Sequence, residues 1–267
     1  MAMMRDGGGI TGEPHWGGTA LLRPGVLAFT GSIGTTDLHA HHAVQIVTAT
    51  TPFTMRDEHG NQHRGTKVVV PADAPHRVEV GAPEGTVVFL EPESAPGRSA
   101  HLRALRSGWT VAPVLTFTRR RPLAVVVDEL IEHLAPAMAA DEAVTRHRAV
   151  DEALRLLPDL VTAGPVSGTE LAAQVGVSAS RLTHLFTEQV GIPLRRYVLW
   201  LRLRLAIICA HAGDDLTGAA HNAGFSDSAH LTRTTREMFG LAPSALSRHV
   251  SWDLGPKCSR IVQADEP

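Results

Sequence analysis

The sequence contains little cysteine and no long apolar run. Its two cysteines, Cys209 and Cys258, are too few for a disulfide framework, so reduced thiols are expected. No uninterrupted apolar stretch approaches the length of a membrane span. The first residues are rich in methionine and glycine and lack the apolar core of a signal peptide. These absences predict a cytoplasmic protein that makes no contact with a membrane.

Aromatic residues are also scarce, at 4% of the chain. Those before residue 115 are Trp16, Phe29, Phe53, Phe89 and Trp109, too few to indicate what a pocket there would bind. By contrast, hydrophobic residues make up 43% and charged residues 19%, which is typical of a folded chain rather than a disordered one. A length of 267 residues leaves room for two ordinary domains.

Lysine is absent from residues 165–250. This segment contains eight arginines and six acidic residues, so its net charge is +2. The whole chain carries −2, so the remainder is acidic. This asymmetry favours contact with nucleic acid through the C-terminal part. Because each protomer has few groups that neutralise phosphates, useful affinity is expected to need a dimer or a neighbouring partner.

One pattern occurs twice in the last third of the chain, at about residues 167–193 and 215–243. In the first copy Ser167 and Glu170 form a capping box at the start of a short helix. Gly176 then supplies a sharp turn, since glycine enters positive φ without steric cost. A second capped helix and a terminating glycine follow in both copies. The pattern predicts two helix-turn-helix units in tandem.

The second helix of each copy has a stripe of short or polar side chains opposite its apolar stripe, and this would let it approach base edges in a major groove. The stripes comprise Ser180, Thr183, His184 and Thr187 in the first copy and Ala229, Thr232, Arg233 and Arg236 in the second, with Ser228 at the helix start. Arg233 is the most informative, because a guanidinium fork can bond guanine bidentately. Pro193 opens a long helix between the copies, and about 20 residues would give it a length of roughly 30 Å. That length suits successive major-groove segments, which lie about 34 Å apart.

From Pro165 to His249 the chain resembles the AraC/XylS transcriptional regulators. The matching residues are Leu171-Ala172-Ala173, Ser178, the run from Leu182 to Phe186, Gly191-Ile192-Pro193, Arg202-Leu203 with Ala206, and Gly224-Phe225-Ser226-Asp227-Ser228 through Pro243. The resemblance implies seven helices that bind double-stranded DNA. It implies base contacts from Ala179, Ser180, Thr183 and His184 in the first recognition helix and from Ser228, Ala229, Thr232 and Arg233 in the second. A homodimer is expected, with RNA polymerase as a further partner if the protein is an activator.

The second copy departs from the family at three core positions. Ala219 stands where the family has a bulky residue, Thr235 where it has phenylalanine, and Thr234 is polar at the position that matches Leu185. Trimming large core side chains typically costs about 2–5 kcal/mol unless the site collapses. The sequence therefore predicts a loosely packed second subdomain.

Residues 20–95 have the pattern of a β structure. Short apolar runs, such as Val44–Val47 and Val87–Leu90, are separated by glycine and proline turns, a spacing typical of a sandwich or small barrel. Residues 58–61 are predicted to form a hairpin tip, and the glycine-rich residues 1–19 a flexible arm.

Residues 34–91 resemble the cupin barrel. His39, His41 and Gln45 are similar to its first motif, with glutamine in place of the usual glutamate. Gly65, Pro71 and His76 are similar to the second, although Asp73 replaces a glycine and Val80 an asparagine. In metal-binding cupins these positions hold a metal, whereas sensor domains of AraC-type regulators more often use the barrel for an organic ligand. Three imidazoles and an amide oxygen suit a divalent transition metal. The alternative is a set of cavity histidines that are hydrogen-bonded without metal. If His41 points into the barrel, His42 should point out of it.

Two amphipathic helices are predicted within residues 122–160, the second ending at Pro158. The stripe of the first contains Leu123, Val126, Val127, Leu130, Ile131 and Leu134, and it could pack on the barrel or form a homodimer seam. The predicted fold is thus α+β: a cupin-like sensor and dimerisation domain at residues 20–160, a DNA-binding domain at 161–250 and a tail at 251–267.

The predicted function is a sequence-specific transcriptional regulator that responds to a small-molecule effector through its barrel. No catalytic residue and no required cofactor is expected. Two alternatives use the barrel differently: a metal sensor that binds its ion through the histidines, or a cupin enzyme with a DNA-binding appendage.

Overall fold

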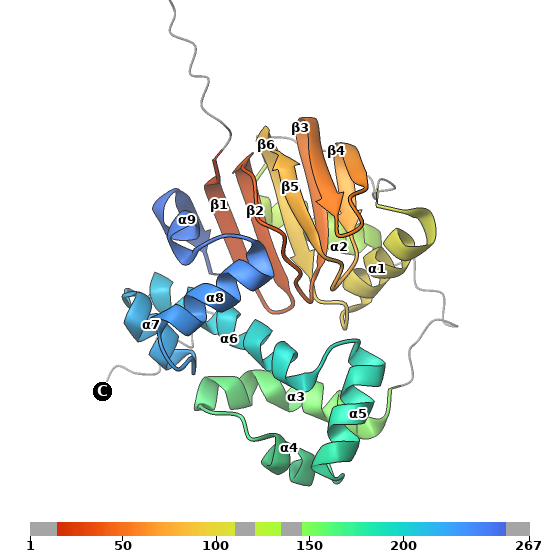
Figure 1. Ribbon diagram of the computed structural model, residues 1–267, viewed down its shortest axis with the longest axis vertical. Coiled ribbons are helices and arrows are strands. Elements are labelled where there is room, and N and C mark those ends of the chain that lie inside the picture. The colour runs from red at the N-terminus through yellow and green to blue at the C-terminus, as the bar shows by residue number, and fades with distance from the viewer. Residues whose placement is uncertain (1–14, 110–120, 135–145, 255–267) are drawn as a thin grey trace, which may run out of the picture.

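The computed structural model of the chain describes residues 15–109, 121–134 and 146–254. It is an α+β structure in which a twisted sheet is covered on both faces (Figure 1). One face packs on the first two helices, and the other packs on the C-terminal helices. In keeping with the sequence, no helix among the described residues is both long and apolar enough to cross a bilayer.

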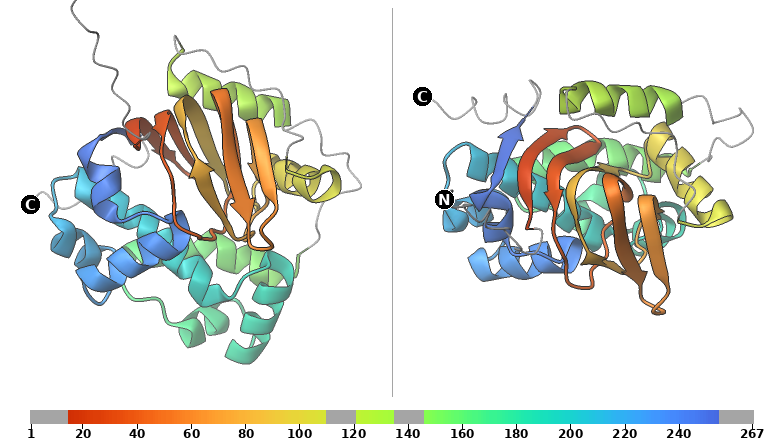
Figure 2. Two further views of the ribbon diagram at one scale, coloured as in Figure 1. Left: turned by 45° about the horizontal axis from the view of Figure 1, so that its top comes forward. Right: turned by 90° about the horizontal axis from the view of Figure 1, so that it is seen from above.

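The sheet has the strand order β4-β3-β6-β2-β1-β7, with β5 paired to β3. The strands are β1 (Gly17–Arg23), β2 (Val26–Ile33), β3 (Val44–Asp57), β4 (Gln62–Val70), β5 (His76–Val80), β6 (Ala82–Leu90) and β7 (Val250–Asp253). The predicted hairpin tip lies between β3 and β4, and the Asp57 carboxylate accepts bonds from the backbone N–H groups of His59 and Asn61. The closed cupin barrel predicted from the sequence is not found: within the described part the sheet curls but its edge strands β4 and β7 do not pair (Figure 2).

Both ends of the described chain meet at one edge of this sheet. β7 runs parallel to β1, with Thr19 opposite Ser251. β1 begins at Gly17, so the last residues of the predicted arm belong to the sheet, while residues 1–14 lie outside the described residues. The predicted tail likewise starts as a strand, and residues 255–267 lie outside the description. The C-terminal domain is therefore joined to the sheet both by the chain before it and by β7 after it.

The helices are α1 (Ala95–Ser107), α2 (Leu123–Leu134), α3 (Arg148–Ala163), α4 (Gly168–Gln174), α5 (Ala179–Val190), α6 (Leu194–His211), α7 (Leu216–Asn222), α8 (Ser228–Phe239) and α9 (Pro243–Arg248). The apolar stripe of α2 packs on β1 and β2, so it is part of the core and does not form a free dimer seam. α3 was expected in the sensor domain and was expected to end at Pro158. It continues through Pro158 to Ala163 and packs on α4, α5 and α6.

The two helix-turn-helix units are α4-α5 and α7-α8, as predicted. The Ser167 and Ser178 side chains cap α4 and α5, and Gly176 and Gly224 make the turns at φ 75° and 77°. The second recognition helix is capped by Asp227, which the sequence analysis had not singled out.

Three core positions of the second unit hold small residues. Ala219, Thr234 and Thr235 are each at most 2% exposed, and the Thr235 hydroxyl donates to the Leu231 carbonyl at 2.8 Å. Beside Ala219 and Thr235 lies a groove of about 700 Å³ between α6, α7, α8 and β7. This groove lies at two of the positions where the sequence predicted loose packing.

We expect Thr235→Phe to stabilise the second unit, because the new ring would fill part of this groove while the hydroxyl it replaces bonds only its own helix. The expected gain is about 1 kcal/mol, or about 2–4 °C in the unfolding temperature. Calorimetry of the full chain measures it. A fall in the unfolding temperature would show that the groove cannot accept the ring.

Candidate nucleic-acid interface and histidine site

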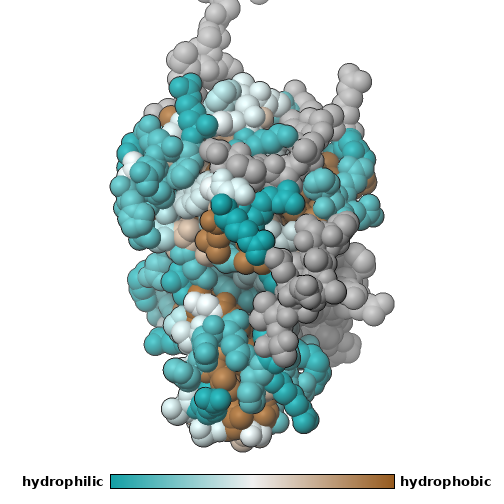
Figure 3. All heavy atoms as spheres, turned by 90° about the vertical axis from the view of Figure 1, so that its right-hand side faces the viewer, coloured by the Kyte–Doolittle hydropathy of each residue, from teal (hydrophilic) through white to brown (hydrophobic). Residues whose placement is uncertain are grey.

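The two recognition helices present the predicted stripes to solvent. In α5, Ala179, Ser180, Thr183, His184 and Thr187 are all exposed; in α8, Ala229, Arg233 and Arg236 are exposed and Ser228 and Thr232 are half-buried. The hydroxyls of Thr183, Thr187 and Thr232 each donate a hydrogen bond to the backbone carbonyl four residues earlier. These hydroxyl oxygens can therefore still accept hydrogen bonds. The face of the molecule in Figure 3 is mainly hydrophilic, with small separate apolar areas among the described atoms.

Helix α6 joins the two units and also fixes them to the sheet domain. Its Arg204 forms an ion pair with Glu91 at the end of β6 and donates to the Arg23 carbonyl at 2.6 Å. Trp200 donates to the same Glu91 carboxylate at 3.2 Å, and Arg196 donates to the Ala40 carbonyl at 3.0 Å. Buried charges need such partners. These bonds therefore set how the DNA-binding domain sits on the sheet.

The predicted cupin residues do come together. His39, His41 and His76 are buried, and their ligand nitrogens lie within 4.8 Å of one another. His39 and His76 are held opposite each other by a two-way backbone bridge, with N–O distances of 2.9 and 2.8 Å. Gln45 on β3 completes the cluster: its Oε1 lies 3.0 Å from His41 Nε2 and 2.7 Å from His76 Nε2. The four residues are called the histidine site below.

Each of the three rings is fixed in one tautomer. The Nδ1 atoms of His39, His41 and His76 lie 2.8 Å from the carbonyls of Asp37, Ala43 and Ala74. A carbonyl oxygen can only accept, so each Nδ1 carries the hydrogen and each Nε2 offers a lone pair. This outer hydrogen bond is the arrangement that orients metal-binding histidines.

The rings are also neutral at ordinary pH. Burial, with the neighbouring His41, lowers the pKa of His39 to about 3. Burial likewise lowers the pKa of His41 and, together with the other two rings, lowers that of His76 well below its usual value. Neutral imidazole is the form that binds metal. The site thus gathers three imidazole lone pairs around an amide.

Such a cluster of acceptors can be satisfied in two ways. The Gln45 amide can turn its NH₂ toward His41 and His76, or a cation can occupy the space between the nitrogens. Two imidazole nitrogens that bind one zinc ion lie at most about 4.2 Å apart, because each zinc–nitrogen bond is about 2.1 Å. Small rotations of the histidine side chains would shorten the distances between their nitrogens, now up to 4.8 Å, to this value. The residues therefore fit a divalent transition metal.

Two cupin-motif departures have structural explanations. Asp73, which replaces a glycine of the motif, has φ 60°, the left-handed backbone that glycine adopts most easily. Val80, which replaces an asparagine, is 55% exposed and lies away from the site. His42 points away from the site, as predicted. Its ring lies between Asp73 at 3.3 Å and Glu93 at 2.6 Å and against Tyr197 of α6.

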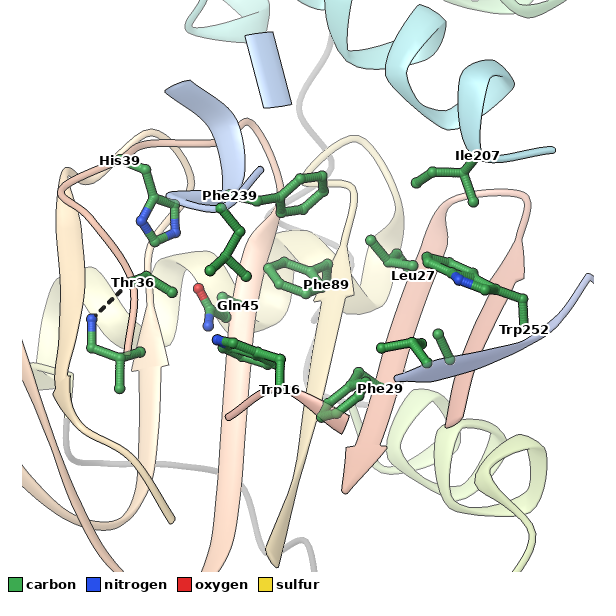
Figure 4. Close-up of a pocket in the computed structure, with 14 residues that line it drawn as sticks. Trp16, Leu27, Phe29, Thr36, His39, Gln45, Phe89, Ile207, Phe239 and Trp252 are labelled. Carbon is green, nitrogen blue, oxygen red and sulfur yellow. Dashed lines mark hydrogen bonds between the residues drawn. The ribbon is translucent and has the colours of Figure 1, made fainter. Parts of the chain in front are cut away.

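The last turn of α8 closes the inner face of the sheet beside the histidine site. Phe239 contacts the rings of His41, Phe89 and Trp200 at centroid distances of 6.4, 5.7 and 6.0 Å. Figure 4 shows Phe239 above Phe89, with His39 on one side of them and Ile207 and Trp252 on the other. The cavity along this wall measures about 50 Å³, enough for water but not for a metabolite.

The sequence analysis missed this closure. It identified Gly240 only as a helix terminator and gave Phe239 no role. No short-range signal could have found the contact with the β domain, because His41 and Phe89 are about 150 to 200 residues away from Phe239 in the chain.

Comparison with known proteins agrees with this arrangement. Residues 171–249 match a family described as a helix-turn-helix domain. The transcriptional activator RhrA of Rhizobium meliloti (strain 1021) is 32% identical over 88 residues, which are 32% of this chain and 28% of that protein. The match thus spans less than a third of the curated relative.

Two crystal structures of ToxT from Vibrio cholerae have a similar fold. An apo variant gives a TM-score of 0.53 at 11% identity, covering 82% of this chain and 96% of that one. A second structure gives 0.51 at 10% identity, covering 85% and 100%. The fold is therefore that of a two-domain protein with an N-terminal β domain and a C-terminal double helix-turn-helix. Residues 171–249 are a helix-turn-helix domain of the AraC type.

The His42 cluster predicts how stability depends on pH. Burial alone would lower the pKa of His42, but its bonds to Asp73 and Glu93 and their charges raise it to about 9. This value lies above that of an unfolded histidine, about 6.5. The stabilisation is therefore complete below about pH 6.5 and is lost as pH rises through 9, with an upper bound of about 3 kcal/mol.

Urea unfolding of the full chain from pH 6 to 9.5 measures this loss. In His42→Gln the free energy of unfolding should fall less steeply over that range, even though the variant is less stable throughout. Neighbouring His101 and Tyr197 are unchanged in the variant and serve as the common background. Equal slopes for the two proteins would contradict the assignment.

Proposed function

We propose that the chain is a sequence-specific DNA-binding transcriptional regulator whose DNA-binding domain responds to what its β domain binds. The observation that carries this proposal is the pair of exposed recognition stripes on α5 and α8, which are joined by α6, the helix whose Arg196 and Arg204 bond to the β domain. The AraC-type match over the same residues supports it. Arginine and threonine side chains on these stripes are suited to base edges and phosphates.

A homodimer and, for an activator, contact with RNA polymerase remain part of the proposal. RhrA is described as a transcriptional activator, which favours the activating role here. The small net positive charge of residues 165–250 supports a dimer, since two protomers double the phosphate contacts. The α2 stripe is used by the core, so the dimer contact would use another surface.

Arg233→Ala tests the DNA assignment. The exposed guanidinium of Arg233 is expected to read one guanine, so its loss should cost about 1–3 kcal/mol at the best site and remove preference at one base step. Selection of binding sites from random DNA by the full chain, followed by titration, measures both.

Arg64→Ala is the matched control, because this exposed arginine lies on the hairpin strand β4 of the other domain. It removes the same charge and should leave base preference intact. Unchanged preference at every position in Arg233→Ala would refute the role of α8 in base recognition.

A second function is favoured by the histidine site: we propose that the β domain binds a divalent transition metal. The three buried imidazoles lie together with their Nδ1 atoms bonded to backbone carbonyls, and the Gln45 amide oxygen lies against His41 and His76. Zinc, iron, nickel and manganese all accept this donor set. A cupin enzyme is disfavoured, because glutamine occupies the position of the carboxylate that could exchange protons.

We expect the purified chain to bind about one transition metal ion, and His76→Ala to lose it, since one of three imidazoles is removed. Metal analysis after reconstitution with zinc measures the stoichiometry. His59→Ala, on the exposed hairpin tip, is the control and should keep the metal. Failure of the unaltered chain to bind zinc would leave the turned Gln45 amide as the explanation of the cluster.

A further inference from the structure

The segment from Thr36 to Ala40 lies between the histidine site and the second recognition helix. On one side it carries His39, whose backbone pairs with His76. On the other side its N–H groups bond the last turn of α8: Asp37 N–H donates to the Gly240 carbonyl at 3.1 Å, and Ala40 N–H donates to the Glu237 carbonyl at 3.2 Å. The same five residues thus support both a candidate metal ligand and a DNA-reading helix.

The contact at Gly240 is close enough to exclude any side chain. Gly240 has φ 65° and ends α8. A Cβ atom there would lie 2.5 Å from the Asp37 carbonyl oxygen and 2.7 Å from His39 Nδ1. These are the two atoms of the hydrogen bond that fixes the His39 tautomer. Movement of the end of α8 would therefore disturb the outer hydrogen bond of a metal ligand.

Phe239 adds a second path between the same two parts. Its ring packs on His41 and Phe89, so the histidine site is covered by the residue next to Gly240. The Arg196 bond to the Ala40 carbonyl holds the segment to α6 as well. Among the residues that the structure describes, no comparable contact connects the first recognition helix to the site: a Cβ on Gly191, the glycine that ends α5, would have no atom within 4 Å.

We propose that metal binding at the histidine site and docking of the second helix-turn-helix on the β domain stabilise each other through residues 36–40. A metal ion on His39 would fix this segment and with it the end of α8. Docked α8 would in turn keep His39 oriented for the ion. Such coupling is reciprocal by thermodynamic necessity. The inference rests on the proposed metal centre and assigns the second recognition helix, not the first, as the part that responds.

The chain offers a matched pair of variants for the test. Gly240→Ala and Gly191→Ala each put a side chain on a left-handed glycine after a recognition helix, with φ 65° and 93°, so their backbone strain is similar. Only the Cβ at position 240 meets the segment that carries His39. Zinc affinity of each full-length variant is measured by competition with a chromogenic chelator.

Gly240→Ala is expected to weaken zinc binding by about tenfold although every ligand is retained, while Gly191→Ala stays within about twofold of the unaltered chain. Zinc should also slow amide exchange in residues 228–240 of the unaltered chain, but not in Gly240→Ala. Phe239→Leu keeps the helix end and loses only the aromatic ring, and it should also weaken zinc binding. This second variant tests the proposal if Gly240→Ala does not fold.

Two results would overturn the proposal, and they are distinguishable. Equal zinc affinity in all the variants would refute the coupling and leave the metal centre standing. Absence of zinc binding in the unaltered chain would refute the metal centre itself, and the coupling with it. Neither result bears on DNA recognition by Arg233, which is measured separately.

Discussion

The structure depends on the docking of helices α6 and α8 against the inner face of the sheet. The half-buried carboxylate of Glu91 accepts from Arg204 and Trp200, and Phe239 fills the space above Phe89. An ion pair of this kind is costly to bury and costly to break once its partners are fixed. The main effect of the ion pair is therefore to fix the orientation of the DNA-binding domain, and its net contribution to the free energy of unfolding is small. β7 restrains the same domain from its other end.

This docking also explains how a poorly filled helix-turn-helix persists. Ala219 and Thr235 leave a groove in the second unit, so its own core supplies less apolar contact than a bulky set would. The end of α8 is held instead by Phe239 and by the backbone bonds of Asp37 and Ala40. The second recognition helix is thus positioned partly by the domain that would bind the effector. A domain held this way responds to changes in its neighbour, whereas a self-sufficient one would not.

Local features of both domains could be predicted from the sequence, because capping and turn chemistry act over a few residues. Ser167, Ser178, Gly176 and Gly224 occupy the predicted caps and turns. The histidine site was found through the resemblance of short segments to the cupin motifs, although His39 and His41 lie in the loop before β3. By contrast, Pro158 was wrongly taken as a helix end: burial of Leu157 and Val161 on either side offsets the lost backbone bond. The β7 pairing, the open sheet and the Phe239 contact join residues far apart in sequence, and no local pattern encodes them.

The central claim is that the histidine site and the DNA-reading surface communicate. The most direct measurement is the zinc affinity of the full chain, free and bound to saturating operator DNA. We predict that saturating DNA changes the Kd for zinc by about tenfold, and that saturating zinc changes the Kd for DNA by the same factor. An identical zinc Kd with and without DNA would contradict it.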